Sequence, residues 1–292
     1  MAELRAALAQ PRREGRRIGL VPTMGAFHDG HRSLMRRARA ECDEVVVSLF
    51  VNPAQFNESA DLAAYPRDES HDGMIAAEES VDFLFVPELA EIYPEGFATT
   101  VRVRGVTEML EGVHRGREHF DGVATVVCKL FNIVAPQVAF FGQKDVQQTI
   151  VVRRMIRDLN LPVALEICPT VRDPDGLALS SRNARLSSAE RERATALHQA
   201  LATIQVLLSA GDTDATRLLA AARSELEDPL VRVEYLQIVD PDTLTPLATV
   251  DRPALAVVAA WLGATRLIDN RPLATPRRSR PPLAAGSRTR SV

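Results

Sequence analysis

The stretch Ile18-Gly-Leu-Val-Pro-Thr-Met-Gly-Ala-Phe-His-Asp-Gly-His31 decides the fold, because a strand, a turn and a helix start follow one another in it. The apolar run 18–22 ends in Pro-Thr-Met-Gly, which is typical of a strand that enters a turn. We predict a helix over 31–40. The run Glu-Val-Val-Val-Ser-Leu-Phe-Val at 44–51 is too continuously apolar for a half-exposed strand, so we predict a buried one. Strand, helix and strand in this order form a βαβ unit, which implies a parallel sheet.

The same alternation continues along the chain. It predicts helices over 70–80, 122–135 and 144–160, and strands over 81–86, 137–141 and 163–167. After Asp173-Pro-Asp-Gly176 the pattern changes to two helices, near 188–208 and 214–227, and three strands, at 232–239, 254–261 and 265–269. The sequence therefore predicts an α/β protein with a parallel-sheet domain over 1–175, a smaller α+β domain over 176–275 and a tail without fixed structure over 276–292.

The composition is that of an ordinary soluble globular protein. The 292 residues are 46% hydrophobic and 25% charged, which excludes disordered, collagen-like and membrane classes. The longest strongly apolar run, 45–51, is far too short to span a bilayer. The N-terminal segment lacks the apolar stretch of a signal peptide, so we do not expect export. Cys42, Cys128 and Cys168 are widely separated and in no metal-binding spacing, which suits the reducing cytoplasm.

The charge distribution argues against a general nucleic-acid binder. The net charge is −3, and the tail over 276–292 carries five arginines and no acid, so the rest of the chain is still more acidic. The tail could touch phosphates, but this composition is more typical of a disordered end. Of the 35 basic residues only Lys129 and Lys144 are lysine. Because nearly all the other basic residues are arginine, a lysine indicates a place that needs a compact ammonium. The alternative, above all for Lys129, is that the lysine is present by chance.

Polar loops follow the predicted strands at 22–31, 52–56 and 142–148, and a fourth, 179–183, follows at longer range. In an open parallel sheet ligands bind beyond the carboxyl ends of the strands, so these loops should meet in one cleft. His28 and His31 stand at a helix start, where unpaired N–H groups suit a phosphate. Gly25 and Gly30 would let the backbone approach it. The alternatives are a metal pair, which would prefer a spacing of four residues and a third ligand, and two unrelated surface histidines.

Further polar residues fit a nucleotide-dependent reaction of a carboxylate. Lys144, after Gly142, is placed to bind a phosphate, while Asp145 either caps the helix or meets ribose or metal. The loop Ser180-Ser181-Arg182 could close over a triphosphate, although such sequences are common in loops. Gln55 and Gln148 could hold a carboxylate without neutralising it, or lie on the surface. Asp68, Glu69 and Asp72 could hold Mg²⁺, or form a solvated helix start. No P-loop, G-x-G-x-x-G or G-x-S-x-G motif is present.

Six blocks in order resemble the pantothenate synthetase (pantoate–β-alanine ligase) family. They are Val21-Pro-Thr-Met-Gly-Ala-Phe-His-Asp-Gly-His31, Phe50-Val-Asn-Pro-Ala-Gln-Phe56, Tyr65-Pro-Arg67, Phe141-Gly-Gln-Lys-Asp-Val-Gln-Gln148, Pro169-Thr-Val-Arg172 and Asp175-Gly-Leu-Ala-Leu-Ser-Ser-Arg-Asn183. A weaker likeness continues through 233–236 to 265–270. The resemblance implies a Rossmann-like domain of the nucleotidyltransferase superfamily with the H-x-G-H motif, a small C-terminal lid and a homodimer.

The resemblance also implies the reaction and its residues. Pantoate and ATP would form pantoyl adenylate with Mg²⁺ present, and β-alanine would then displace AMP to give pantothenate. The implied catalytic residues are His31, in the proton-donor position, His28, Lys144 and Arg182. Gln55 and Gln148 would hold pantoate, with Gln55 also near β-alanine. Apart from the resemblance, the acidic cluster makes Asp72 a candidate metal ligand. The implied ATP site comprises Met24, Gly25, Ala26, Phe27, His28, Asp29, Gly30, His31, Gly142, Gln143, Lys144, Asp145, Val171, Leu179, Ser180, Ser181 and Arg182.

One departure from the family pattern and two alternative functions stay open at the level of sequence. Leu179 stands where the family usually has methionine, an apolar exchange of similar volume that should be mild. Another nucleotidyltransferase with the same histidine motif, such as a cytidylyltransferase or a ligase of another acid, is the main alternative enzyme. A nucleotide-binding module without turnover would need a broken catalytic set, yet both histidines, Lys144 and Arg182 are present.

Overall fold

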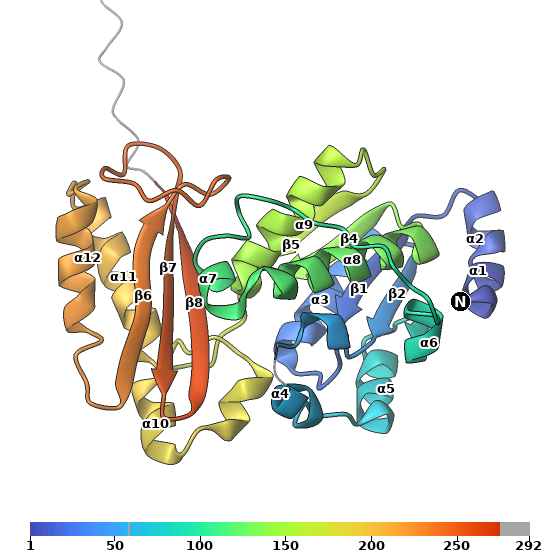
Figure 1. Cartoon of the computed structure of the whole chain (residues 1–292), viewed down its shortest axis with the longest axis horizontal. Helices are drawn as coiled ribbons and strands as arrows, with labels where there is room; N and C mark the ends of the chain where they lie inside the picture. Colours follow the sequence, from blue (N-terminus) through green and yellow to red (C-terminus); the bar gives the residue numbers. More distant parts are fainter. Residues whose placement is uncertain (58, 275–292) are drawn as a thin grey trace, which may run out of the picture.

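A five-stranded parallel sheet, in the order β3-β2-β1-β4-β5, lies at the centre of the N-terminal part of the molecule (Figure 1). The computed structural model describes residues 1–57 and 59–274. The α/β class predicted from the alternating pattern is confirmed. The strands are β1 (Ile18–Thr23), β2 (Glu44–Leu49), β3 (Phe83–Phe85), β4 (Val138–Gly142) and β5 (Ala164–Cys168).

Helices cover both faces of this sheet. Residues of α8 and α9 share one hydrophobic core with Ile18 and Leu20 of β1, while residues of α3 and α5 pack with Val21 on the opposite face. Coverage on both sides explains why β2 is buried along its whole length. The helices of this part are α1 (Ala2–Ala7), α2 (Ala9–Arg13), α3 (Asp29–Glu41), α4 (Ser59–Ala63), α5 (Glu69–Glu78), α6 (Leu89–Ile92), α7 (Glu111–Arg115), α8 (Arg117–Val134) and α9 (Val146–Asp158), with 3₁₀ turns η1 (Pro53–Gln55) and η2 (Gln143–Asp145).

The strand order reverses at β1, which pairs with β2 on one side and with β4 on the other. The chain leaves β1 toward α3 and leaves β4 toward η2 and α9. The loops after β1 and β4 therefore diverge to opposite faces and leave a crevice between them at the carboxyl ends of the strands. This crevice lies where the sequence predicts that the polar loops converge.

A smaller antiparallel sheet, in the order β6-β7-β8, forms the C-terminal part (Figure 1). Ala256 and Val258 of β7 pack in a core with α11 and α12, whereas Leu255 and Val257 join the core of the first sheet. Both faces of β7 are thus covered, and the small sheet is packed firmly on the larger part. Its elements are η3 (Ser181–Arg185), α10 (Ser188–Arg193), α11 (Ala196–Ser209), α12 (Ala215–Ser224), β6 (Val231–Val239), β7 (Ala254–Leu262) and β8 (Thr265–Leu273).

Some predicted boundaries are wrong. The single helix expected near 188–208 is divided into α10 and α11, and the break coincides with Thr195, whose hydroxyl donates to the carbonyl of Glu192. Such a side-chain bond to the preceding turn bends helices. The strand expected over 81–86 is reduced to β3 at the sheet edge. The predicted tail over 276–292 lies outside the described residues.

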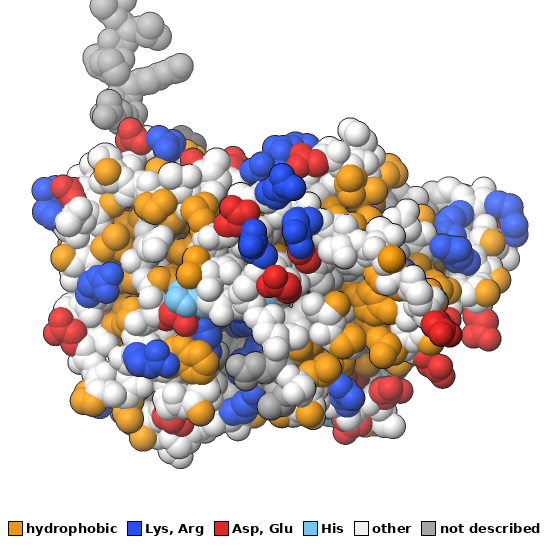
Figure 2. Space-filling model, viewed as in Figure 1, with side chains coloured by type: hydrophobic (Ala, Val, Ile, Leu, Met, Phe, Trp, Pro, Cys, Tyr) orange, Lys and Arg blue, Asp and Glu red, His pale blue; other side chains and the backbone are white. Residues whose placement is uncertain are grey.

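Three general features concern surface charge, the cysteines and the length of the helices. On the face shown in Figure 2, basic side chains are interspersed with acidic ones. Cys42, Cys128 and Cys168 are free thiols, and Cys42 and Cys168 are buried. Within residues 1–57 and 59–274, no helix is both long and apolar enough to cross a membrane.

Candidate active site

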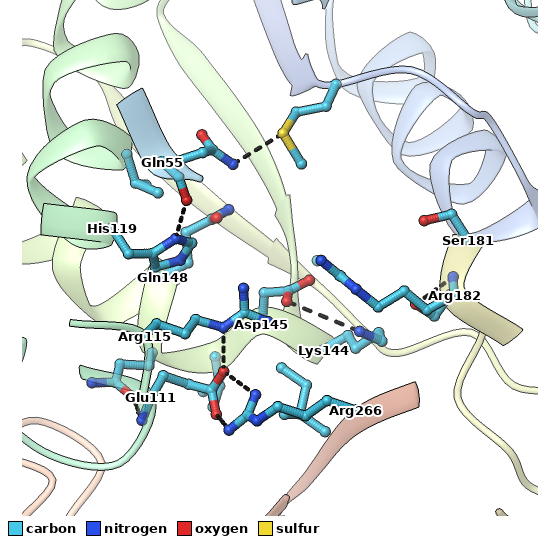
Figure 3. A pocket seen from close by; sticks show the side chains of 18 of the residues that line it. Gln55, Glu111, Arg115, His119, Lys144, Asp145, Gln148, Ser181, Arg182 and Arg266 are labelled. Atoms are coloured by element: carbon cyan, nitrogen blue, oxygen red, sulfur yellow. Dashed lines mark hydrogen bonds and ion pairs between the residues drawn. The ribbon is translucent and has the colours of Figure 1, made fainter. Parts of the chain in front are cut away.

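A cavity of about 570 Å³ occupies the crevice between the two parts of the molecule. Its walls come from the turn after β1, from η1, from the start of α9 and from β6 and β8 of the small sheet. Figure 3 shows Gln55, His119 and Gln148 on one side of it and Lys144, Ser181 and Arg182 on the other. Segments far apart in the sequence therefore meet in one site.

His28 and His31 form a reciprocal cap at the start of α3. His28 is the N-cap residue, and its Nδ1 accepts a hydrogen bond from the N–H of Gly30 at 3.1 Å. The Nδ1 of His31 accepts one from the N–H of His28 at 3.3 Å. The two imidazoles thus occupy the positions of serine and glutamate in an ordinary capping box. A side chain at position 30 would clash, because its Cβ would lie 2.7 Å from Cε1 of His28.

This arrangement keeps both imidazoles neutral. Burial, followed by the neighbouring His28, lowers the pKa of His31 to about 3. Burial and the charge of Lys144 lower the pKa of His28. Since Nδ1 of each neutral ring accepts a hydrogen bond, Nε2 carries the proton. The site therefore offers two uncharged donors beside the positive end of the α3 dipole.

Asp72 of α5 holds the turn that leads to these histidines. Its carboxylate is 1% exposed and accepts hydrogen bonds from the N–H groups of Ala26 at 2.9 Å and Phe27 at 2.7 Å. Gly25 has a φ of +87°, and a Cβ there would lie 2.8 Å from Asp72. The expected role of Asp72 as a metal ligand stays a prediction: each of its oxygens accepts one backbone hydrogen bond, and the residue is not among those that line the cavity. Among the described residues, no group of three or more His, Cys, Asp or Glu side chains could hold a metal ion.

Lys144 enters the cavity from η2, directly after β4. Its Nζ lies 4.0 Å from Oδ1 of Asp145, and both side chains line the cavity. Gln143 behaves differently: its amide donates to Asn270 of β8 at 2.9 Å, and it is not among the lining residues. From the other wall Ser180 caps η3, with its Oγ accepting from the N–H of Arg182 at 3.3 Å.

Gln55 and Gln148 lie together at the other end, as Figure 3 shows. The amide of Gln55 donates to Sδ of Met24 at 3.0 Å and accepts from Asn52 at 2.9 Å. Its backbone carbonyl bonds Nδ1 of His119 at 2.7 Å. Gln147, the neighbour of Gln148, instead bonds the backbone of Val106, Met109 and Glu111 and is buried. The two adjacent glutamines thus have different surroundings: Gln148 lines the cavity, and Gln147 is buried in the protein.

The sequence reasoning missed a charged network at the base of the cavity. Glu111 of α7 accepts from both terminal nitrogens of Arg266 of β8, at 2.6 and 2.7 Å, and from Nε of Arg115 at 2.8 Å. Tyr235 donates its hydroxyl to the same carboxylate at 2.6 Å. Burial opposes ionisation of Glu111, but the bond from Arg266 and the charge of Arg115 outweigh it and lower its pKa to about 2. No sequence motif marks these residues, since Glu111 and Arg266 are 155 positions apart.

Most of the predicted site residues line the cavity, and a minority do not. The predicted residues that do not line it are Gly25, Ala26, Phe27, Asp29, Asp72 and Gln143. The predicted residues that line it are Met24, His28, Gly30, His31, Gln55, Gly142, Lys144, Asp145, Gln148, Val171, Leu179, Ser180, Ser181 and Arg182.

Comparison with known proteins identifies the family. A sequence model of the family described as pantoate-beta-alanine ligase matches residues 1–272. The chain belongs to the pantoate–β-alanine ligase family. The family expected from the six blocks is thereby confirmed, and with it the predicted ligase activity.

Individual relatives agree with this assignment. The ligase is 52% identical to a pantothenate synthetase of Koribacter versatilis over 92% of this chain and 93% of the relative. It is 53% identical to one of Chelativorans sp. over 94% and 96%. Among solved structures, the pantothenate synthetase of Thermus thermophilus matches with a TM-score of 0.88 at 48% identity, over 92% and 96% of the two chains. The enzyme of Francisella tularensis, described as complexed with beta-gamma ATP and beta-alanine, matches with a TM-score of 0.72 at 34% identity, over 89% and 90%.

Proposed function

We propose that the cavity joins pantoate to β-alanine in two steps. The pantoate carboxylate attacks the α-phosphorus of ATP, an O–P bond forms, and pyrophosphate leaves. The β-alanine amine then attacks the acyl carbon of pantoyl adenylate, loses a proton and expels AMP. The observation that carries the proposal is the imidazole pair at the start of α3, which faces the same cavity as Lys144 and Gln148.

The histidine pair suits the departing pyrophosphate. Both rings present an Nε2–H, and the α3 N-terminus adds its dipole, so charge that develops on phosphate oxygens is stabilised where it appears. The incoming carboxylate is already ionised and needs no general base. His31 and His28 therefore act on the leaving group as neutral hydrogen-bond donors through Nε2, while Nδ1 of each ring stays bonded to the backbone.

Cations from both walls complete the ATP site. Lys144 approaches the phosphates from η2, and Arg182 approaches from η3. Two anions repel one another in the uncatalysed reaction, so screening their charge and holding them in line supplies much of the acceleration. We place the adenosine and triphosphate against Met24, Gly30, Gly142, Val171 and Leu179 to Arg182, all of which line the cavity.

Gln55 and Gln148 hold pantoate in this proposal. Their amides can bond hydroxyl and carboxylate oxygens without neutralising the nucleophile. Gln55 is preset by its bonds to Asn52 and Met24, which leave its position little freedom. Pre-positioned neutral donors lower the entropy lost when the two reactants are aligned.

Arg115 offers a place for the carboxylate of β-alanine. Its Nε is bonded to Glu111, and Figure 3 shows it between Glu111 and the side where His119 and Gln148 lie. Among the described residues, no hydrogen bond of its two terminal nitrogens is found. A guanidinium held in this way presents two parallel donors to a carboxylate. The amine of a β-alanine bound there would reach toward the pantoyl group.

Mg²⁺ enters as part of the Mg–ATP substrate, since Mg²⁺ is typically held by substrate phosphates and water with few protein carboxylates. Asp145 is the acidic side chain nearest to Lys144 in the site and could contact that complex. We further propose that the ligase is a cytoplasmic homodimer in which the C-terminal part, 176–275, covers the cleft. Light scattering of the purified chain tests the dimer.

The test of the function is release of AMP and pyrophosphate from Mg–ATP, with pantoate and β-alanine supplied singly and together. We expect AMP release only with both substrates, and ATP–pyrophosphate exchange with pantoate alone. Exchange supported by another carboxylic acid, with pantoate inactive, would instead favour a ligase of that acid. CTP-dependent pyrophosphate release would favour a cytidylyltransferase.

A further inference from the structure

Asn270 of β8 bonds the loop that carries Lys144 with its whole side-chain amide. Its Nδ2 donates to the carbonyl of Gln143 and to the carbonyl of Lys144, both at 2.9 Å. Its Oδ1 accepts from Nε2 of Gln143 at 2.9 Å. Asn270 is 3% exposed, so these bonds are shielded from water. Both amide hydrogens and the amide oxygen are thereby used on one short segment.

These bonds fix the backbone of Lys144 in particular. The carbonyls of Gln143 and Lys144 belong to the two peptide planes on either side of the Lys144 Cα. Because each peptide unit is planar, fixing both planes fixes φ and ψ of Lys144. The direction of its Cα–Cβ bond follows from these angles, and with it the region that the ammonium can reach.

The position of Asn270 is itself held from the first part of the chain. Its backbone N–H donates to Oδ1 of Asp269 at 2.7 Å, and Asp269 is 4% exposed. Arg172 donates to both oxygens of Asp269, at 2.6 and 2.9 Å. Arg172 directly follows Val171, which lines the cavity. A bidentate pair of this kind restricts both partners in direction as well as distance.

We propose that Asn270 is a positioning residue that aims Lys144 at the phosphates and makes that aim depend on docking of the small sheet. The inference rests on the role proposed above for Lys144. It assigns to β8 a part in the first half-reaction, although Asn270 itself acts through the backbone of another residue. A substitution of Asn270 therefore has its effect on Lys144 and little effect where Lys144 is absent.

A double-mutant cycle tests this dependence. We expect Asn270→Ala to lower kcat/KM for pantoate-dependent ATP–pyrophosphate exchange by about 10- to 100-fold, the range of coupling between residues in contact. In a Lys144→Ala background the same change should cost less than about twofold. If Asn270→Ala lowers kcat/KM by the same factor with Lys144 present and with Lys144 replaced, the proposal is wrong. Asn132→Ala is the matched control, because its amide donates to the backbone of Cys128 on the exposed side of α8.

A readout independent of activity uses the fact that Lys129 and Lys144 are the only lysines. Reductive ¹³C-dimethylation keeps their charge and gives one NMR signal for each lysine and one for the N-terminal amine, and the variants Lys129→Arg and Lys144→Arg assign the two lysine signals. Asn270→Ala should move the Lys144 signal and leave that of Lys129 in place. Asn270→Asp keeps the shape of the side chain but places an oxygen next to the two carbonyls, so it should also move the Lys144 signal. It replaces Asn270→Ala in the test if the alanine variant does not fold.

The two measurements separate the possible failures. If Lys144→Ala alone leaves exchange unchanged, the proposed role of Lys144 on ATP is wrong, and the NMR signal still decides whether Asn270 positions the side chain. An unchanged Lys144 signal in folded Asn270 variants refutes the positioning role whatever the activity.

Discussion

The rings of His28 and His31 lie 4.2 Å apart between their centroids, and each accepts a hydrogen bond at Nδ1 from the first turn of α3. The same atoms that cap the helix therefore fix the tautomer of each ring. Nδ1 of each ring caps the helix, which leaves Nε2–H for the role proposed above. The spacing of three residues follows from this, because it is the spacing between the N-cap residue and N3.

The substitution His28→Asn should separate the helix-capping role of His28 from its proposed role as an Nε2–H donor. Asparagine is as good an N-cap as any residue, so the unfolding free energy of His28→Asn should lie within about 0.5 kcal/mol of the wild-type value. It lacks the Nε2 donor, and removal of one such donor typically costs about 100-fold or more in kcat. Urea unfolding and ATP–pyrophosphate exchange measure the two effects. His28→Ala should lose stability as well, and an active His28→Asn would show that the ring is needed only as a cap.

Stability should fall with acidification because His31 is held neutral. Its pKa is about 3 in the folded chain against an ordinary value of 6.5, so below pH 6.5 the unfolded chain binds a proton that the folded one does not. The free energy of unfolding therefore falls by at most about 1.4 kcal/mol per pH unit, and the fall continues until the pH approaches 3. His119, whose pKa burial lowers to about 4, acts in the same direction.

His31→Gln should therefore flatten the pH dependence of unfolding between pH 6.5 and 5. Urea unfolding at pH 7, 6 and 5 measures the slope for both proteins. His71→Gln, at an exposed position of α5, is the control and should keep the wild-type slope. An unchanged slope in His31→Gln would mean that the folded chain protonates this ring near neutral pH.

The two lysines allow a matched pair of substitutions. Lys144→Arg should lower ATP–pyrophosphate exchange at least about tenfold, because a wide planar guanidinium does not replace a compact ammonium in a fixed site. Lys129 lies with Nζ 4.5 Å from the centroid of the Phe97 ring, outside the cavity, a contact that arginine also makes. Lys129→Arg should be neutral. Equal, wild-type rates in both variants would refute the argument from lysine retention.

The adjacent glutamines should respond in opposite ways. Gln148→Ala should raise the KM for pantoate more than the KM for ATP and leave stability nearly unchanged. Gln147→Ala removes buried bonds to three backbone groups and should destabilise the fold by about 2–3 kcal/mol. Steady-state kinetics and urea unfolding of both variants distinguish them. Equal effects of Gln148→Ala on the two KM values would count against its assignment to pantoate.

Arg115→Gln should affect the second half-reaction alone. It removes the donors proposed for β-alanine, so the KM for β-alanine should rise by about 10-fold or more, as expected for loss of a charge-assisted pair. Pantoate-dependent ATP–pyrophosphate exchange, which needs no β-alanine, is the internal control and should persist. If ATP–pyrophosphate exchange falls as much as the overall reaction, Arg115 either contacts ATP or stabilises Glu111.

Much of the fold follows from local pattern. The apolar run at 44–51 predicts β2 because a strand covered on both faces has no polar alternation, and the histidine motif predicts the start of α3. The ends of the helices and strands are predicted less well than their presence. The division between α10 and α11 coincides with Thr195, and β3 is shorter than the apolar run that predicts it.

The site is predictable only where its residues lie in contiguous blocks. Asp72 looks like a member of an acidic surface cluster in the sequence, whereas the fold buries it under the Ala26–Phe27 turn. Glu111 and Arg266 carry no local signal, because an ion pair between two elements is formed only when those elements pack.

The sequence by itself determined the parallel sheet, the family and the loops that carry the chemistry, because strand periodicity, helix caps and contiguous motifs are local properties of the chain. Only the tertiary structure decided which polar side chains face the cavity and which support it. Gln147 and Gln148 are chemically identical neighbours, and Asn270 lies 126 positions from Lys144. Packing sets their surroundings: Gln147 is buried against the 106–111 segment, and Asn270 reaches the backbone of Lys144 because β8 packs on η2.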